Sequence, residues 1–348
     1  SNNPVVHATI YINGTTIGTI TNPEGLFALD NVVPPCEIVI SHISYATEII
    51  DFKYFKDTVL YIKLNPRDVE LGIIEVMDKN LRKENLNHFK NRFLGTDYWG
   101  KNAFILNDSV LVFSREKASD REVHFFESEF LPADSSSVLF TVNAKAPLLI
   151  HLPLLGYKLH VNLIHYTELL TGNINDYRFH TLGYFYFQPE EDASKRKTNR
   201  FGKKRLEAFY NSDRHFIRSL YNNQLLENGY EILYSVFNPE TEFNEFKEFE
   251  LDKHIVRTGG TAKIAGLKNK RLLIKYFEEF HRPVNLVKIK EDRDQLPLPM
   301  ALSRIYFLKD SCTIRADGSR PDNSIMFGPT IGDKRVGAML PDDFQPDM

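Results

Sequence analysis

The chain has 348 residues, a length that corresponds to about two domains of ~150 residues each. Its 43 lysines and arginines nearly balance its 46 aspartates and glutamates, so the formal net charge is −3. Nucleic-acid binding requires an excess of positive charge against the phosphates, and this balance therefore argues against a nucleic-acid partner.

Hydrophobic residues make up 42% of the chain, which is enough for sizeable cores. The longest apolar runs, such as Ala146–Leu155, are interrupted by Pro and His and fall far short of ~20 residues, so we expect no transmembrane segment. Two cysteines, Cys36 and Cys312, are too few for a disulfide scaffold or a zinc cage. The sequence begins at Ser1 without Met or a signal-peptide pattern, as expected after removal of a targeting peptide or trimming of the chain.

The first 66 residues show the pattern of a small β-sandwich. Ala8, Ile10 and Ile12 alternate with polar residues as in a half-buried strand, and Asn13-Gly14 is typical of a hairpin turn. Turn signals then separate further short segments of strand character, which predicts an all-β module over residues 1–66. The additional strands are expected at Ile17–Ile20, Leu26–Leu29, Glu37–Ile43 and Val59–Leu64.

Three strings within this module carry a resemblance: Ala8–Thr15, Gly18–Phe27 and Ile40–Glu48. Together they resemble the carboxypeptidase regulatory-like domain, which is a transthyretin-like sandwich. The resemblance implies a non-catalytic module of a kind common in envelope proteins of Gram-negative bacteria. It therefore implies a location in the periplasm or at the outer-membrane surface.

Residues 67–78 are predicted to be a linker or a last strand, and residues 79–348 an α+β domain. A helix is expected from about Asp78 to Leu94, because apolar residues recur along it at near-helical spacing. Gly95 is a suitable C-terminal stop.

Apolar alternation after Trp99 predicts an antiparallel sheet with a helical insertion at about Phe201–Leu226. The predicted fold class is thus mainly β: a transthyretin-like β-sandwich followed by a larger α+β domain with a helical pair. The strands of this domain are expected at Ala103–Phe113, Glu122–Phe130, Ser137–Asn143, Leu148–Leu152, Tyr157–Leu163, Phe179–Phe187, Tyr230–Phe237, Phe249–Arg257, Arg271–Tyr276 and Arg304–Leu308.

The helical pair has clear local signals. Asn211 can adopt a left-handed conformation, Ser212 is a good N-cap, and a second helix should begin at Asp213 with Phe216 and Leu220 on its inner face. Together with Leu154–Lys158 and the tail Arg335–Phe344, this region is similar to envelope proteins of unassigned function that join such a region to the same N-terminal module. That second resemblance implies no established activity.

The spacing His124-x-x-Glu127 matches a zinc carboxypeptidase motif, in which His215 or His254 would supply the distant ligand. Because residues 123–130 alternate like a strand, the two side chains should point to opposite faces. A zinc-dependent peptidase or a carbohydrate-active hydrolase nevertheless stays open as an alternative, since a site assembled from distant strands leaves no local motif.

Other chemical motifs are weaker. His160 and His165, five apart on a strand, are expected to face opposite ways and share no metal. The Gly259–Lys263 segment lacks a phosphate-binding pattern and is interpreted as a loop. Structural thiols are the favoured interpretation of Cys36 and Cys312, with a bridge between them as the alternative in an oxidising compartment. We therefore predict no catalytic residue, no metal and no cofactor.

Two surface features remain. The aromatic stretch Tyr184–Phe187 favours a strand buried on both faces over a sugar-stacking platform. A run of seven positive charges in eleven residues is a candidate surface for an acidic partner, lipid headgroups or a polyanionic glycan, with a solvated helix start as the alternative. Its residues are Lys195, Arg196, Lys197, Arg200, Lys203, Lys204 and Arg205.

The sequence thus favours a non-catalytic envelope protein that binds or positions a partner, an envelope protein or a glycan, through surface contact. The enzyme alternative above and a protein that directly binds a glycan or peptide are the competing hypotheses.

Overall fold

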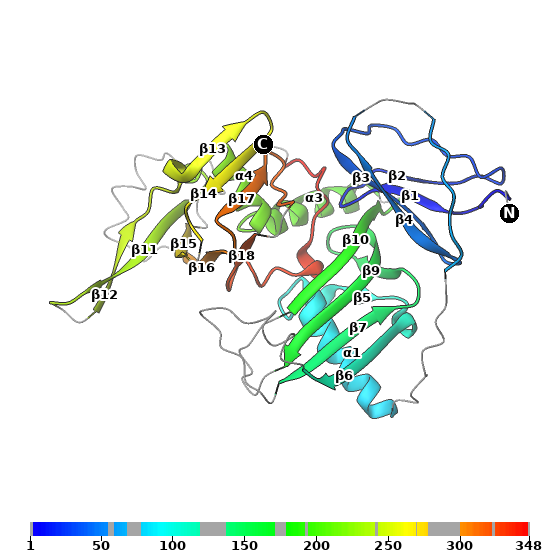
Figure 1. Cartoon of the computed structure of the whole chain (residues 1–348), viewed down its shortest axis with the longest axis horizontal. Helices are drawn as coiled ribbons and strands as arrows, with labels where there is room; N and C mark the ends of the chain where they lie inside the picture. The colour runs from blue at the N-terminus through cyan, green and yellow to red at the C-terminus, as the bar shows by residue number, and fades with distance from the viewer. Residues whose placement is uncertain are drawn as a thin grey trace. The chain divides into compact units, whose positions relative to one another are not determined.

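The computed structural model describes residues 3–54, 59–67, 78–118, 137–170, 179–191, 194–240, 243–268, 270–277, 300–321 and 324–346. The chain divides into two compact units, Ser1–Phe201 and Gly202–Met348. The predicted domain limits at residues 66 and 78 stay predictions. The architecture is mainly antiparallel β with a few helices, as predicted (Figure 1).

The N-terminal module is built on a four-stranded antiparallel sheet in the order β2-β1-β3-β4. Its strands are β1 (Thr9–Ile12), β2 (Gly18–Ile20), β3 (Cys36–His42) and β4 (Tyr45–Phe52). The predicted hairpin at Asn13-Gly14 is confirmed: it joins β1 to β2, and Gly14 takes φ 78°.

Two segments of the module that were predicted to be strands are not strands. Residues 26–29 and 59–64 have no strand pairing in the structure. The alternation in the second segment is nevertheless real, because Leu60, Ile62 and Leu64 pack on the module's core. Tyr61, between them, is 96% exposed. A period of two therefore reports which face is buried, but not whether the backbone has a hydrogen-bonding neighbour.

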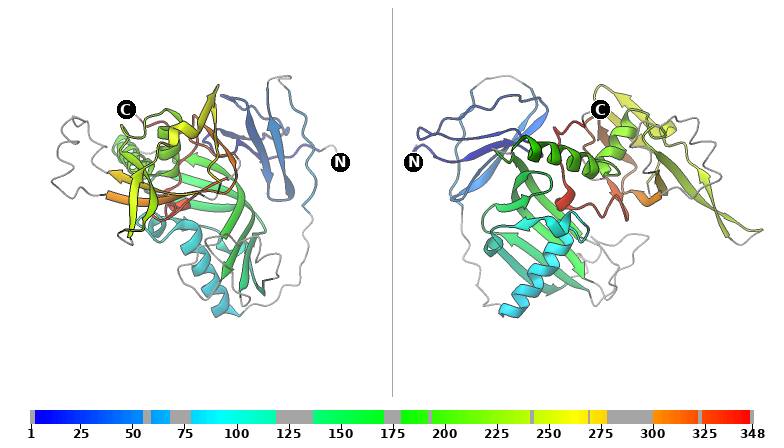
Figure 2. Two further views of the ribbon diagram at one scale, coloured as in Figure 1. Left: turned by 60° about the vertical axis from the view of Figure 1, so that its left-hand side comes forward. Right: turned by 180° about the vertical axis from the view of Figure 1, so that it is seen from behind.

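The rest of the first unit is helix α1 (Lys79–Leu94) on a six-stranded antiparallel sheet. The predicted helix is confirmed: the side chain of Asp78 caps its first turn and Gly95, at φ 104°, follows its last residue. Phe89 and Phe93 are buried, and Figure 2 shows that α1 lies along one face of the sheet. The strands are β5 (Phe104–Ile105), β6 (Leu111–Lys117), β7 (Val138–Ala144), β8 (Leu148–Leu152), β9 (Tyr157–Leu170) and β10 (Phe179–Pro189).

One predicted strand of this sheet is interrupted and another cannot be assessed. The segment expected as Ala103–Phe113 consists of β5, a 3-10 turn at Asp108–Val110 and the start of β6. Asn107 causes the break, because its side chain accepts from Leu149 N and donates to Pro147 O, which turns the backbone out of the strand. The expected strand Glu122–Phe130 lies outside the described residues.

Helix α3 (Lys195–Phe209) crosses the boundary between the units, and α4 (Asp213–Tyr221) follows it. The predicted connection is confirmed: Asn211 has φ 53°, and the Ser212 side chain accepts a hydrogen bond from His215 N. The insertion is displaced from its predicted limits, since α3 begins at Lys195 and α4 ends at Tyr221.

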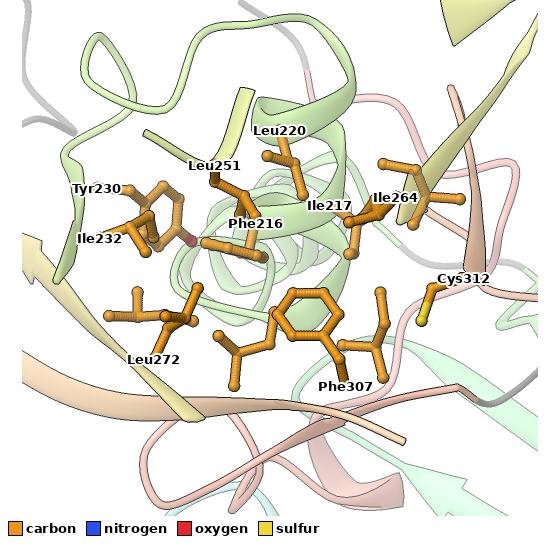
Figure 3. Close-up of a cluster of buried hydrophobic side chains, with 14 of the residues drawn as sticks. Phe216, Ile217, Leu220, Tyr230, Ile232, Leu251, Ile264, Leu272, Phe307 and Cys312 are labelled. Atoms are coloured by element: carbon orange, nitrogen blue, oxygen red, sulfur yellow. The ribbon is translucent and has the colours of Figure 1, made fainter. Parts of the chain in front are cut away.

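The second unit packs two antiparallel sheets around α4. Phe216 and Leu220 of α4 are fully buried, as predicted, and Figure 3 shows Phe216 among Tyr230, Leu251 and Phe307. The five-stranded sheet has the order β12-β11-β15-β16-β18 and the three-stranded sheet β13-β14-β17. These strands are β11 (Tyr230–Asn238), β12 (Phe243–Glu248), β13 (Ile255–Thr258), β14 (Thr261–Ala265), β15 (Arg271–Phe277), β16 (Met300–Phe307), β17 (Ser311–Arg315) and β18 (Ile325–Phe327).

The predicted strand Phe249–Arg257 is wrong over its first half. Leu251–His254 form a 3-10 turn, and only the following residues join β13. The segment resembles a strand in sequence because Phe249, Leu251 and Ile255 all pack on the core of this unit, although a 3-10 turn lies between them.

Candidate functional site

Helix α3 carries all seven residues of the predicted basic patch. Arg196, Arg200 and Lys203 are exposed and are spaced by four and three residues, so they form one row along the helix. We call these three residues the basic stripe. Among the residues that the structure describes, none of the three forms an ion pair.

The other cations of the patch differ in their surroundings. Lys195 and Lys197 are exposed, whereas Lys204 and Arg205 are half-buried. The Lys197 ammonium lies 2.9 Å from a carboxylate oxygen of Glu190. The Lys204 ammonium lies 2.6 Å from Glu207, three residues further along the helix. Two cations of the patch are therefore neutralised by neighbouring carboxylates, whereas no carboxylate of the described residues pairs with the basic stripe.

Glu190 links the start of α3 to the sheet. One of its carboxylate oxygens lies 2.9 Å from His151 Nε2 and the other binds Lys197. Burial raises the pKa of Glu190, but the hydrogen bonds and charges of His151 and Lys197 outweigh it, so the net pKa is lowered. The carboxylate thus holds the first turn of α3 against β8.

A second anchor is apolar. Phe201 is buried, and a Cβ added to Gly156 would lie 2.4 Å from its ring. Gly156 also has φ 68° in the turn between β8 and β9. Both observations explain why glycine occupies this position of the Leu154–Lys158 segment. The inner face of α3 is fixed, and the basic stripe faces away from it.

The N-terminal module is joined to the sheet through its first hairpin. Gly14 N donates to Phe185 O over 2.8 Å, and Phe187 N donates to Thr15 O over 3.0 Å. The Asn13 side chain accepts from Phe185 N over 3.0 Å. The hairpin tip therefore pairs with β10 through main-chain hydrogen bonds.

A polar contact lies beside this joint. Asn162 of β9 donates to the Tyr11 hydroxyl over 2.7 Å and accepts from the Ser41 hydroxyl over 3.0 Å. Burial raises the pKa of Tyr11 strongly, and the hydrogen bond from Asn162 only partly offsets this. Asn162 is 5% exposed although it stands on the outer face of the sheet, because the module covers it.

The aromatic stretch of β10 belongs to the same joint. Phe187 is fully buried, but Tyr184, Phe185 and Tyr186 are half-buried, so the expectation of a strand buried on both faces is wrong for three of the four. The Tyr186 ring stacks on Tyr11 with centroids 5.3 Å apart. Near Tyr186, the outer face of β10 is thus covered by the module and not by a core of its own.

Sequence reasoning missed a buried charged cluster between α1 and the sheet. The side chain of Glu168 is fully buried, and its oxygens lie 2.8 Å from His88 Nε2 and 2.9 Å from Arg92 Nε. Tyr166 donates its hydroxyl to the same carboxylate over 2.8 Å. In the sequence, the only indication of this cluster is a glutamate, Glu168, within the otherwise apolar end of β9. The cluster holds α1 on the sheet by charge as well as by packing.

The predicted histidine geometry needs one correction. A register shift between Leu182 and Gly183 leaves Ile164 as an extra residue in β9, which reverses the alternation beyond it. His160 and His165 therefore share the outer face, contrary to expectation. They have separate partners: His160 Nε2 lies 3.0 Å from Gln188, and His165 Nε2 lies 3.2 Å from His180 Nδ1.

The spacing His124-x-x-Glu127 lies outside the described residues, so the expectation that its two side chains point to opposite faces stays a prediction. The two candidates for the distant ligand both have partners within the protein. His215 bonds to the Tyr230 hydroxyl over 2.8 Å, and His254 Nδ1 lies 3.1 Å from Ala265 O. Within the described ranges, no three side chains of His, Cys, Asp or Glu gather closely enough to hold a metal ion.

The remaining motifs have structural explanations. Cys36 and Cys312 form no disulfide, and Cys312 is buried with its thiol 3.5 Å from Lys309 O. The loop expected at Gly259–Lys263 is confirmed only for Gly259 and Gly260, which form the tight turn between β13 and β14 at positive φ. Thr261–Lys263 belong to strand β14 instead. None of the helices in the described part of the chain is long and apolar enough to cross a membrane.

Comparison with known proteins identifies the N-terminal module. Residues 1–76 match the model of the CarboxypepD_reg-like domain. Neither the comparison with curated proteins nor the comparison with solved structures gave a match.

Proposed function

We propose, from the premise that residues 1–76 form a CarboxypepD_reg-like domain, that this chain is a non-catalytic protein of the bacterial envelope that binds an anionic partner through α3. The envelope location follows from the resemblance of the module to those of Gram-negative envelope proteins. Its periplasmic or outer-membrane placement is part of the proposal.

The observation that carries the binding role is the basic stripe. Its three cations project from a helix whose inner face is fixed by Phe201. Their charges face solvent without a carboxylate partner among the described residues, so a ligand would meet them with little competition from within the chain. Because the row runs along the helix for about 10 Å, a linear polyanion fits it better than a compact ion. We therefore favour an acidic envelope glycan over an envelope protein.

The module would serve as a positioning element. Its hairpin is hydrogen-bonded to β10, and β10 leads directly toward the start of α3. An anchor of this kind fixes the orientation of the sheet from which α3 extends, without any chemistry of its own.

The test compares two variants of equal charge. R196E/R200E/K203E removes the basic stripe, and K83E/K101E/K158E reverses three exposed lysines elsewhere; each changes the net charge from −3 to −9. The probe is dextran sulfate with neutral dextran as its control, and affinity is measured by calorimetry at several salt concentrations.

We expect the stripe variant to lose affinity for dextran sulfate at least tenfold and to show a smaller salt dependence, while the lysine control stays within about threefold of wild type. Equal losses in both variants would mean that only net charge matters and would refute the proposal. Binding of neutral dextran with the same affinity would refute it too, since a neutral glycan does not need the stripe.

A further inference from the structure

His165 of β9 and His180 of β10 lie side by side on the outer face of the first unit's sheet. Their nearest ring nitrogens, His165 Nε2 and His180 Nδ1, are 3.2 Å apart, and the ring centroids are 5.3 Å apart. Both side chains are half-buried. The pair is therefore reachable from solvent but is held on paired strands.

The β-bulge creates this pair. In the register, His165 stands opposite Leu182 and His180 opposite Thr167, so the two histidines are diagonal neighbours. Without the extra residue Ile164, His165 would share the face of Val161 and Leu163, which are buried. The bulge instead directs His165 to the outer face, where it meets His180.

We propose that His165 and His180 form a binding site for a divalent transition-metal ion of the zinc type. Two imidazole nitrogens that each lie 2.0–2.1 Å from a tetrahedral metal are about 3.3 Å from each other. The 3.2 Å separation in this structure is close to that value, so both rings can bind the ion with little displacement of the strands. Imidazole is the ligand type that zinc, copper and nickel share.

The metal would replace a proton between the rings. In the neutral pair one ring donates N–H to the other, and metal binding moves the proton of the donating ring to that ring's second nitrogen. No net proton is released. Two protein ligands leave further coordination positions for water, because no third His, Cys, Asp or Glu of the described residues joins them. We therefore expect affinity in the micromolar range and not that of a closed structural site.

This inference is independent of the proposed glycan binding, because the pair and the basic stripe are on different elements. The test uses the full chain without a polyhistidine tag, stripped of metal by a chelator. Zn²⁺ is titrated calorimetrically into wild type, H165N, H180N and the control H160N. The control histidine stands on the same sheet face and contacts Gln188.

We expect one Zn²⁺ per wild-type chain, at least tenfold weaker binding in H165N and in H180N, and no change in H160N. Circular dichroism verifies the fold of each variant. Absence of Zn²⁺ binding in wild type, or binding that survives both H165N and H180N, would overturn the proposal.

Co²⁺ provides a test that needs no variant. Wild-type chain with one equivalent of Co²⁺ should show the intense visible absorption of tetrahedral Co²⁺, and added Zn²⁺ should abolish it by competition. A spectrum that remains that of aqueous Co²⁺ would refute a tetrahedral site at this pair.

Discussion

Asn162 donates its side-chain amide to the hydroxyl of Tyr11 over 2.7 Å, and the two residues are 151 positions apart in the chain. The same side chain accepts from Ser41, so one asparagine of β9 satisfies two hydroxyl groups of the N-terminal module. The contact is nearly dry, because Asn162 is 5% exposed and Tyr11 is 1% exposed. These side-chain hydrogen bonds join the module to β9, beside the main-chain hydrogen bonds that join its hairpin to β10.

We expect N162A to lower the free energy of unfolding by about 1–3 kcal/mol, because it leaves two buried hydroxyl groups without their partner. Urea denaturation followed by circular dichroism measures the effect. Y11F removes the hydroxyl that Asn162 contacts, so the double variant Y11F/N162A should cost less than the sum of the single variants. Strict additivity would show that the two side chains are not coupled.

The buried carboxylate of Glu168 gives a second prediction. E168Q keeps the shape of the side chain but removes the negative charge that His88 and Arg92 face. Because the half-buried side chains of His88 and Arg92 would lose their anionic partner, we expect a loss of about 1–3 kcal/mol in the free energy of unfolding.

The matched control is E116Q, on the exposed end of β6 in the same sheet, where the expected change is below about 0.5 kcal/mol. Urea unfolding under identical conditions measures the free energy of unfolding of E168Q, E116Q and wild type. Similar small effects at both positions would mean that the cluster does not stabilise α1 on the sheet.

A third prediction concerns pH. The lowered pKa of Glu190 means that its ionised form is favoured in the folded state, so its stabilising contribution is present above the ordinary glutamate pKa of about 4.3. That contribution is lost as the pH falls through the lowered folded-state value. We expect E190Q to be less stable than wild type at pH 7, and the difference to shrink toward zero below pH of about 4.

The measurement is the free energy of unfolding of both proteins at several pH values. His151 contributes to the lowered pKa, so H151N should reduce the pH-dependent difference between wild type and E190Q. A difference that is constant from neutral to acidic pH would contradict the ionic role of Glu190.

Local sequence signals predicted the elements that depend on short-range interactions. The N-cap at Ser212, the left-handed Asn211 and the Asn13-Gly14 hairpin all follow from the chemistry of two to four adjacent residues. The resemblance of the first module was equally readable, because its spaced glycines and aromatics lie within one continuous segment.

The features that required the structure depend on which strands become neighbours. The bulge at Ile164 reverses the alternation of inner and outer side chains along β9, and no local sequence pattern predicts this extra residue. The diagonal pair of His165 and His180 follows from that bulge and from the β9–β10 register. The partners of Asn162 lie more than a hundred residues away, so its role was beyond the reach of local patterns.

The last prediction separates the binding role of α3 from its stability. Lys195 and Arg196 are exposed in the first turn of α3, and that turn carries no acidic residue. The helix macrodipole places partial positive charge there, so cations at this end are unfavourable by a few tenths to about 1 kcal/mol each. A cationic first turn is thus a local cost to the fold, as is common where surface charge serves binding.

We therefore expect K195E/R196E to raise the free energy of unfolding and at the same time to weaken binding of dextran sulfate. The control R200E/K203E makes the same change in net charge in the middle of the helix, where the dipole has little effect. Both variants should lose glycan affinity, but the first should be the more stable by about 1 kcal/mol, measured by urea denaturation at low ionic strength. If the two variants are equally stable, the first turn of α3 carries no electrostatic cost; if only the control loses affinity, the ligand contacts the middle of the helix and not its start.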